Sequence, residues 1–100
     1  MPVFDELMYS ITEDDYNPIS TEKDLQSFLL KTTMRNFHGD YVTSWASYTW
    51  HLSQGHRPGQ AFMNALPDNL YDKLTGTRID PFYKSDMNSV LKALDYLILS

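Results

Sequence analysis

The chain has 100 residues, an apolar fraction of 42% and no cysteine, so we expect one domain without disulfides, thiolate metal sites or cysteine nucleophiles. Acidic residues outnumber basic ones 13 to 8, and the net charge of -5 argues against a basic nucleic-acid-binding protein. No apolar run approaches the ~20 residues of a membrane span, and the first residues do not form a signal peptide. The sequence therefore predicts a cytoplasmic protein without membrane attachment.

The acidic residues are concentrated near the amino end. Residues 1–24 contain seven acidic residues and one basic residue, whereas residues 25–100 contain six acidic and seven basic residues. This asymmetry predicts an acidic amino-terminal arm over residues 1–19 and a helical domain over residues 20–100. Apolar spacing within the arm suits a short helix over residues 3–11, and an edge strand is the alternative.

Two helices are predicted in the next part of the chain. Thr21 and Asp24 form a pair typical of a capping box, and the apolar residues after them have helical spacing. This helix is expected to end near Asn36, just before a glycine. Asp40 is then expected to cap a second helix that runs to about Gln54.

The second predicted helix carries a wide apolar and aromatic face that includes Tyr41, Trp45 and Tyr48. A central helix packed on two sides explains this face. A surface for a partner protein is the alternative, because interfaces favour Tyr and Trp.

Further helices are expected in the second half of the chain. Pro58 suits the first turn of a helix that Pro67 interrupts. A short helix over residues 68–75 follows, and a loop over residues 76–83 leads to a last helix capped by Ser85. The predicted fold class is all-α: a compact single domain of four to five short helices.

Two segments of this half carry a recognisable pattern. RPGQAFMNAL at residues 57–66 has the form R-x-G-Q-x-x-x-N-x-L, and GTRIDPFY at residues 76–83 has the form G-T-x-x-D-P-F-Y. Over residues 57–98 the pattern resembles that of small uncharacterised proteins of tailed bacteriophages and prophages. The resemblance implies a product made inside an infected bacterial cell and no particular activity. Residues 1–56 lack this pattern and are expected to carry the role specific to this protein.

The same two segments also have a structural interpretation. Gln60 and Asn64 lie one helical turn apart, so both amides are expected to hydrogen-bond the backbone of the loop at residues 76–83. Phe82 and Tyr83 would then fill the space between helices. The members of this predicted structural lock are Arg57, Gln60, Asn64, Asp80, Phe82 and Tyr83.

Metal binding is not predicted from the histidines. His51 and His56 are five residues apart, which does not place both on one face of a helix, whereas zinc-binding pairs are usually three or four apart. His38 lies beside a glycine near an expected helix end. We therefore expect no metal site and no cofactor.

Catalysis is not predicted either. The sequence contains no Gly-x-Ser-x-Gly motif and no phosphate-binding loop. The best enzymatic alternative is a cleft formed by Arg57, Gln60, Asn64 and Asp80, which lacks an obvious general base apart from Asp80 or a histidine.

Aromatic residues and the acidic arm together lead to the functional prediction. We expect a small phage-type accessory protein that binds and modulates or inhibits a host protein. The expected contact residues are aromatic or acidic: Phe4, Tyr9, Glu13, Asp14, Asp15, Tyr16, Tyr41, Trp45 and Tyr48. The alternatives are an acidic decoy that mimics nucleic acid for a DNA- or RNA-binding protein, and a virion or scaffold protein. A homodimer is consistent with the surplus apolar surface, and direct nucleic-acid binding is not expected.

Neutralising the acidic turn tests the predicted arm. The triple variant Glu13→Gln, Asp14→Asn, Asp15→Asn is expected to keep the fold and to weaken any partner held by charge, most strongly at low salt. Thermal unfolding followed by circular dichroism checks the fold, and co-purification at low and high salt checks binding. Loss of the fold in this variant would place the arm within the core.

Overall fold

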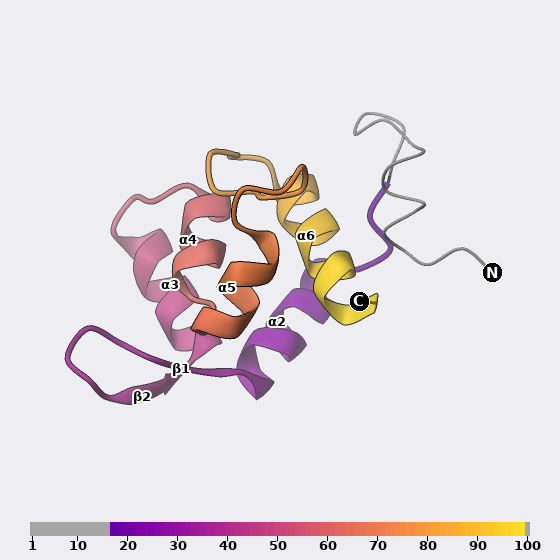
Figure 1. Ribbon diagram of the computed structural model, residues 1–100. Coiled ribbons are helices and arrows are strands. Elements are labelled where there is room, and N and C mark those ends of the chain that lie inside the picture. Colours follow the sequence, from indigo (N-terminus) through magenta and orange to yellow (C-terminus); the bar gives the residue numbers. More distant parts are fainter. Residues whose placement is uncertain (1–16, 100) are drawn as a thin grey trace.

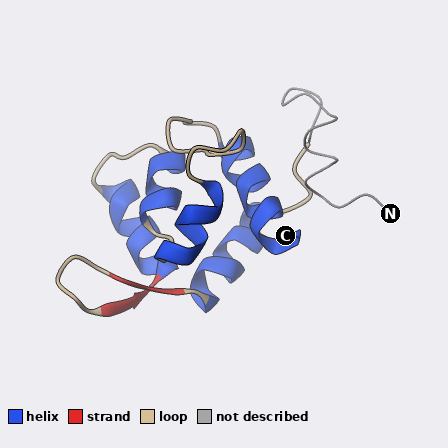
Figure 2. Cartoon of the chain, in the orientation of Figure 1, coloured by secondary structure: helices blue, strands red, loops and turns tan. Residues whose placement is uncertain are grey.

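A computed structural model describes residues 17–99 as a mostly helical single domain with one short hairpin (Figures 1 and 2). The elements in chain order are α2 (Glu22–Lys31), β1 (Thr33–Arg35), β2 (Tyr41–Thr43), α3 (Ser44–Ser53), α4 (Pro58–Asn64), α5 (Asp68–Leu74) and α6 (Met87–Leu99). The prediction of a compact helical domain is confirmed, and the hairpin is the correction to it. Among residues 17–99, no helix has the length and apolar character needed to cross a bilayer.

The hairpin replaces the end of the first predicted helix. α2 begins with the expected capping box, in which the Thr21 hydroxyl accepts from the Asp24 N–H and the Asp24 carboxylate accepts from the Thr21 N–H. The helix ends at Lys31 and does not continue to Asn36. Two β-branched threonines follow Lys31, and their side chains favour extended backbone over helix.

The hairpin also replaces the start of the second predicted helix. α3 begins at Ser44, and its cap is Thr43, whose hydroxyl accepts from the Ala46 N–H at 3.1 Å. Asp40 lies instead in the hairpin turn, where its N–H donates to the side-chain oxygen of Asn36 at 3.0 Å. The predicted cap at Asp40 is therefore wrong, because the N–H of Asp40 is bonded to Asn36 within the hairpin turn.

The register of the hairpin gives it an inner and an outer side. Met34 pairs with Val42 and Arg35 pairs with Tyr41 in an antiparallel ladder. Met34 and Val42 are half-buried, whereas Arg35 and Tyr41 are exposed. Because successive side chains of a strand point to opposite faces, the pair of apolar residues turns toward the body of the protein.

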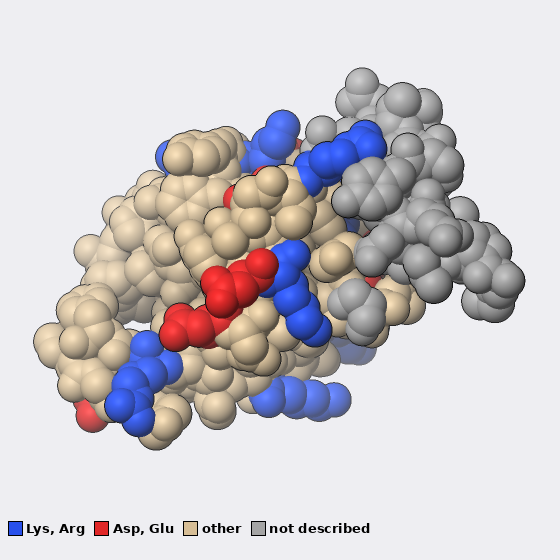
Figure 3. Space-filling view, viewed as in Figure 1, with Lys and Arg blue, Asp and Glu red and all other residues tan. Residues whose placement is uncertain are grey.

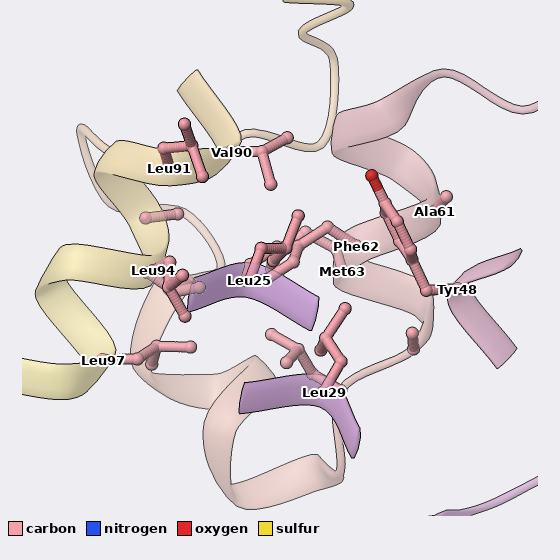
Figure 4. Close-up of a cluster of buried hydrophobic side chains, with 14 residues drawn as sticks. Leu25, Leu29, Tyr48, Ala61, Phe62, Met63, Val90, Leu91, Leu94 and Leu97 are labelled. Atoms are coloured by element: carbon pink, nitrogen blue, oxygen red, sulfur yellow. The ribbon is translucent and has the colours of Figure 1, made fainter. Parts of the chain in front are cut away.

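The hydrophobic core is built around α4. Phe62 and Met63 of this helix are completely buried, and α4 packs against both α3 and α6. Figure 4 shows the side chains that converge on them from the neighbouring helices, among them Leu25, Leu29, Val90, Leu94 and Leu97. A helix of seven residues is too short to be stable by itself, so its burial supplies the stabilisation.

A buried carboxylate fixes the entry of the chain into α2. Asp95 of α6 accepts hydrogen bonds from the N–H groups of Ile19, at 2.7 Å, and Ser20, at 2.8 Å. Charge-assisted bonds of this kind are stronger than neutral ones. Ile19, the last residue of the predicted arm, is thus bonded to the helical body, and residues 1–16 of that arm lie outside the described residues.

The cap of α6 also differs from the prediction. Asp86, and not Ser85, immediately precedes the helix, and its carboxylate accepts from the Ser89 N–H at 3.0 Å. Burial acts to raise the pKa of Asp86, but hydrogen bonds with Ser89 and with its own backbone, together with the charge of Lys84, outweigh burial, and the pKa lies below its usual value.

A close approach of two backbone segments joins α4 to the loop before α6. The Gly59 N–H donates to the carbonyl oxygen of Lys84 at 3.1 Å. A Cβ atom at Gly59 would overlap the carbonyl oxygen of Pro81 and lie 2.7 Å from that of Lys84. Only glycine therefore allows this contact.

Gly59→Ala is expected to lower the free energy of unfolding by about 2 kcal/mol or more, because the loop must move away from α4. Urea unfolding measures this change. The neighbouring variant Gln60→Ala serves as the control and is expected to change stability by about 0.5 kcal/mol or less. Equal costs for the two variants would contradict the role given to Gly59.

Candidate partner-binding site

A cavity of about 330 Å³ lies between the hairpin, α3 and the end of α4. Its lining is mostly apolar and aromatic and includes Met34, Phe37, Val42, Ala46 and Trp50. Phe37 and Trp50 are 81% and 47% exposed, so the rings stand at the cavity with much of their surface in solvent. Exposed rings beside an apolar cavity are typical of a contact site.

The hairpin turn holds Phe37 in place. The side-chain oxygen of Asn36 accepts from the N–H groups of both His38, at 2.9 Å, and Asp40, at 3.0 Å. Gly39 has a φ of 85°, which closes the turn at no steric cost. Phe37 is therefore presented at the tip of a hydrogen-bonded turn.

Five rings form a continuous row, which we call the ring row; four of them line the cavity, and the fifth, His56, lies beyond it. In spatial order they are His38, Phe37, Trp50, His51 and His56. Successive ring centroids are separated by 4.8, 6.3, 5.0 and 4.9 Å. The contacts of Trp50 with Phe37 and with His51 are edge-to-face, an arrangement that aromatic pairs favour.

The end of α3 brings the last two rings together. The His56 N–H donates to the His51 carbonyl oxygen at 3.1 Å, and the Gly55 N–H donates to the Leu52 carbonyl oxygen at 3.0 Å. With Gly55 at a φ of 86°, these bonds form a Schellman motif, which places the residue after the glycine against the last turn of the helix. The Nδ1 atoms of His51 and His56, the histidine pair, lie 2.9 Å apart.

The sequence argument that His51 and His56 do not share a helix face is therefore incomplete. A spacing of five would keep them apart on a continuous helix, but His56 lies beyond the end of α3. The sequence signal that reveals the contact is the glycine just before His56, four residues after His51. Within residues 17–99, no group of three or more His, Cys, Asp or Glu side chains is arranged to hold a metal ion.

The environment of His51 favours its neutral form. Burial, first, and the charge of His56, second, lower the pKa of His51 below its ordinary value. The bond between the two imidazoles requires a proton on one Nδ1 and a bare Nδ1 on the other. The pair is therefore a single hydrogen-bonding unit.

Three predicted contact residues of the described part have different positions. Tyr48 is 3% exposed and belongs to the core, as Figure 4 shows, so the expectation that it forms part of a partner surface is wrong. Burial and the nearby charge of Glu22 raise its pKa. Trp45 is half-buried and packs against the same core. Tyr41 is exposed on the outer side of the hairpin, where its hydroxyl accepts from Arg35 at 2.8 Å.

The other predicted contact residues fall in the amino-terminal segment. Phe4, Tyr9, Glu13, Asp14, Asp15 and Tyr16 lie outside the described residues. Their part in binding stays a prediction.

The predicted lock is built differently from the expectation. Both carboxylate oxygens of Asp80 accept backbone N–H groups within the loop, from Gly76 and Phe82 at 2.9 Å each. Arg57 donates to the Phe82 carbonyl oxygen at 3.3 Å and lies over the Phe82 and Tyr83 rings. The loop is thus closed by its own aspartate and held by Arg57 together with the backbone contact of α4.

Three members of the predicted lock do not take the expected role. Among residues 17–99, neither Gln60 nor Asn64 hydrogen-bonds the loop through its amide, and Asn64 lines the cavity beside the hairpin. Tyr83 is 82% exposed and does not fill the space between helices, whereas Phe82 packs against the core. Asn64 is the last residue of α4, and the cavity that it lines is bounded by α3 and the hairpin and not by residues 76–83.

The charge of the described part is balanced. Residues 17–99 contain eight acidic and eight basic residues, whereas residues 1–16 contain five acidic residues and no basic one. On the face shown in Figure 3, basic and acidic side chains lie in small groups between uncharged areas. The net charge of the chain therefore resides in its first 16 residues.

Compared with protein-family models, curated proteins and solved structures, the chain matches none of them. The resemblance to phage proteins over residues 57–98 stays a prediction.

The lowered pKa of His51 makes stability depend on pH. Because the pKa is lower in the folded than in the unfolded chain, the unfolded chain binds more protons, and the free energy of unfolding falls as the pH drops below the unfolded value of about 6.5. Urea unfolding between pH 8 and 5.5 measures the slope, which we expect His51→Gln to reduce. Ser53→Ala, on the same helix and without a titrating group, is the control. An unchanged slope in His51→Gln would contradict this assignment.

Proposed function

We propose that this protein is a binding module without catalysis, and that it takes an apolar side chain of a partner protein into the cavity beside the hairpin. The observation that carries the proposal is the contact between two exposed rings, Phe37 and Trp50, at the wall of an apolar cavity. Aromatic residues that stand near an apolar pocket dominate the energetics of many interfaces.

The size of the cavity favours a side chain as its occupant. A volume of about 330 Å³ is at the lower end of the range for small-molecule sites, which run from about 300 to 1,000 Å³. A large apolar side chain together with a neighbouring part of its segment can occupy such a space, while the exposed rings cover the backbone around it. This arrangement resembles the pocket-and-anchor contacts of protein interfaces.

The charges around the cavity indicate the chemistry of the partner. His38 and His51 are two bases of the lining, and Arg35 also belongs to it, with its guanidinium bonded to Tyr41 on the outer side of the hairpin. No carboxylate lines the cavity among the described residues. A partner segment with a carboxylate next to its apolar side chain therefore complements this surface.

The resemblance to phage proteins supports a bacterial host protein as the partner, which the chain would meet in the cytoplasm. Binding through the cavity differs from the decoy alternative in its response to salt. An apolar contact persists at high salt, whereas the attraction of exposed carboxylates for a basic groove is screened.

Two exposed aromatic residues offer a matched test. Phe37 and Tyr83 are 81% and 82% exposed, but only Phe37 lines the cavity. The full chain is used as bait in nuclease-treated bacterial lysate at low and high salt. Phe37→Ala and Trp50→Ala are each expected to lower the affinity for the retained partner by about 30-fold, the effect of losing a hot-spot residue. Tyr83→Ala is expected to leave the affinity unchanged.

The outcomes separate the alternatives. A partner that is lost at high salt, and that Phe37→Ala does not affect, would replace the proposal with the acidic decoy. A stable oligomer of the chain that Phe37→Ala dissociates would make a second copy the occupant of the cavity. Equal loss with Phe37→Ala and Tyr83→Ala would overturn the assignment of the site.

A further inference from the structure

The ring row connects the cavity to the hydrogen bond between His51 and His56. His51 contacts Trp50, Trp50 contacts Phe37, and His56 holds His51 from the far end of the row. The orientation of His51 is therefore fixed on one side by Trp50 and on the other by the Nδ1–Nδ1 bond of 2.9 Å. Loss of the His51–His56 bond would free the His51 ring, which packs against Trp50 at the cavity wall.

The protonation state of the pair decides whether the bond exists. With both imidazoles neutral, one Nδ1–H donates to the other Nδ1. With one imidazolium, its Nδ1–H still donates to the neutral partner, and the bond gains from the charge. With two imidazolium ions, two N–H groups and two positive charges oppose one another, and no hydrogen bond remains. The bond thus survives the first proton and is lost with the second.

No carboxylate of the described residues lines the cavity beside His51. The hairpin contributes Arg35 and His38 to the cavity, and Arg57 follows the pair along the chain. α4 contributes the uncharged amide of Asn64. α2 packs against α3, and its Glu22 acts electrostatically on a tyrosine of the core. Within the described residues, the titratable groups of the lining are therefore all bases.

We propose that the histidine pair regulates the cavity: protonation of both imidazoles breaks their bond, releases His51 from its position against Trp50 and weakens partner binding. This inference rests on the proposed function for its effect on the partner. Its structural part concerns the isolated chain alone.

The isolated chain shows the effect by NMR between pH 8 and 4.5, in buffer with a chelator to exclude metal ions. The second proton is expected to bind the pair less readily than the first, because it places two positive charges beside one another. The nuclear Overhauser contact between Trp50 and Phe37 is expected to persist through the first step and to be lost with the second.

His56→Phe is the informative variant. It keeps a ring after Gly55, where a Schellman motif accommodates an apolar residue, but it removes the opposing nitrogen. Its His51 is expected to titrate in one step, with the Trp50–Phe37 contact retained at the lowest pH. Tyr83→Ala, which alters an exposed ring outside both the cavity and the ring row, is expected to behave as the parent chain.

Binding gives the second measurement. Once a partner is identified, its affinity is expected to fall about fivefold or more between pH 7.5 and 5 for the parent chain and not for His56→Phe. Persistence of the Trp50–Phe37 contact through both steps in the parent chain, or its equal loss in His56→Phe, would overturn the proposed regulation. Failure to capture any partner would overturn the proposed function instead, because the NMR result does not depend on one.

Discussion

The arrangement of the whole domain depends on the close approach of α4 to the backbone of the loop before α6. Gly59 allows this approach because a Cβ atom there would overlap the Pro81 carbonyl oxygen. The contact fixes the position of α4, and α4 supplies the completely buried Phe62 and Met63 around which the other helices pack. Asp80 prepares the loop for this contact by binding two of its N–H groups. A loop that is ordered by its own side chain can meet a helix without leaving buried backbone groups unpaired.

The candidate site lies at the other end of α4, away from Gly59. Asn64 ends α4 beside α3, and the hairpin covers the space between them without filling it. A hairpin with three residues in each strand has little packing of its own, so its inner residues rest on α3 while its turn remains at the surface. The exposed position of Phe37 is a consequence of this geometry. A ring that a hydrogen-bonded turn keeps in solvent can stabilise a complex, because a partner that covers it removes apolar surface from water. A ring already buried in the core cannot contribute in this way.

The sequence predicted the elements whose signals are local and failed where one signal competed with another. The capping box at Thr21, Pro58 in the first turn of α4 and the short helix before Gly76 were all found, because caps and breakers act within a few residues. The hairpin was missed because apolar residues at helical spacing continue through a region where β-branched threonines and the Asn36 turn prevail. The expected aromatic surface was wrong for the same reason, because Tyr41 and Tyr48 share a face only on a helix that does not form. The contact of His51 with His56 was missed because it requires the turn at Gly55.

The separation of charge from the cavity suggests how two kinds of recognition can act in one chain. The described part is neutral and carries the apolar cavity, whereas the five acidic residues of positions 1–16 carry the net charge. Long-range attraction mainly raises the rate of association, while the burial of aromatic anchors mainly lowers the rate of dissociation. An acidic segment and an aromatic cavity therefore need not be competing explanations of binding. If both contribute, salt will slow the association of a partner without shortening the lifetime of the complex. Loss of Phe37 will shorten the lifetime without slowing the association.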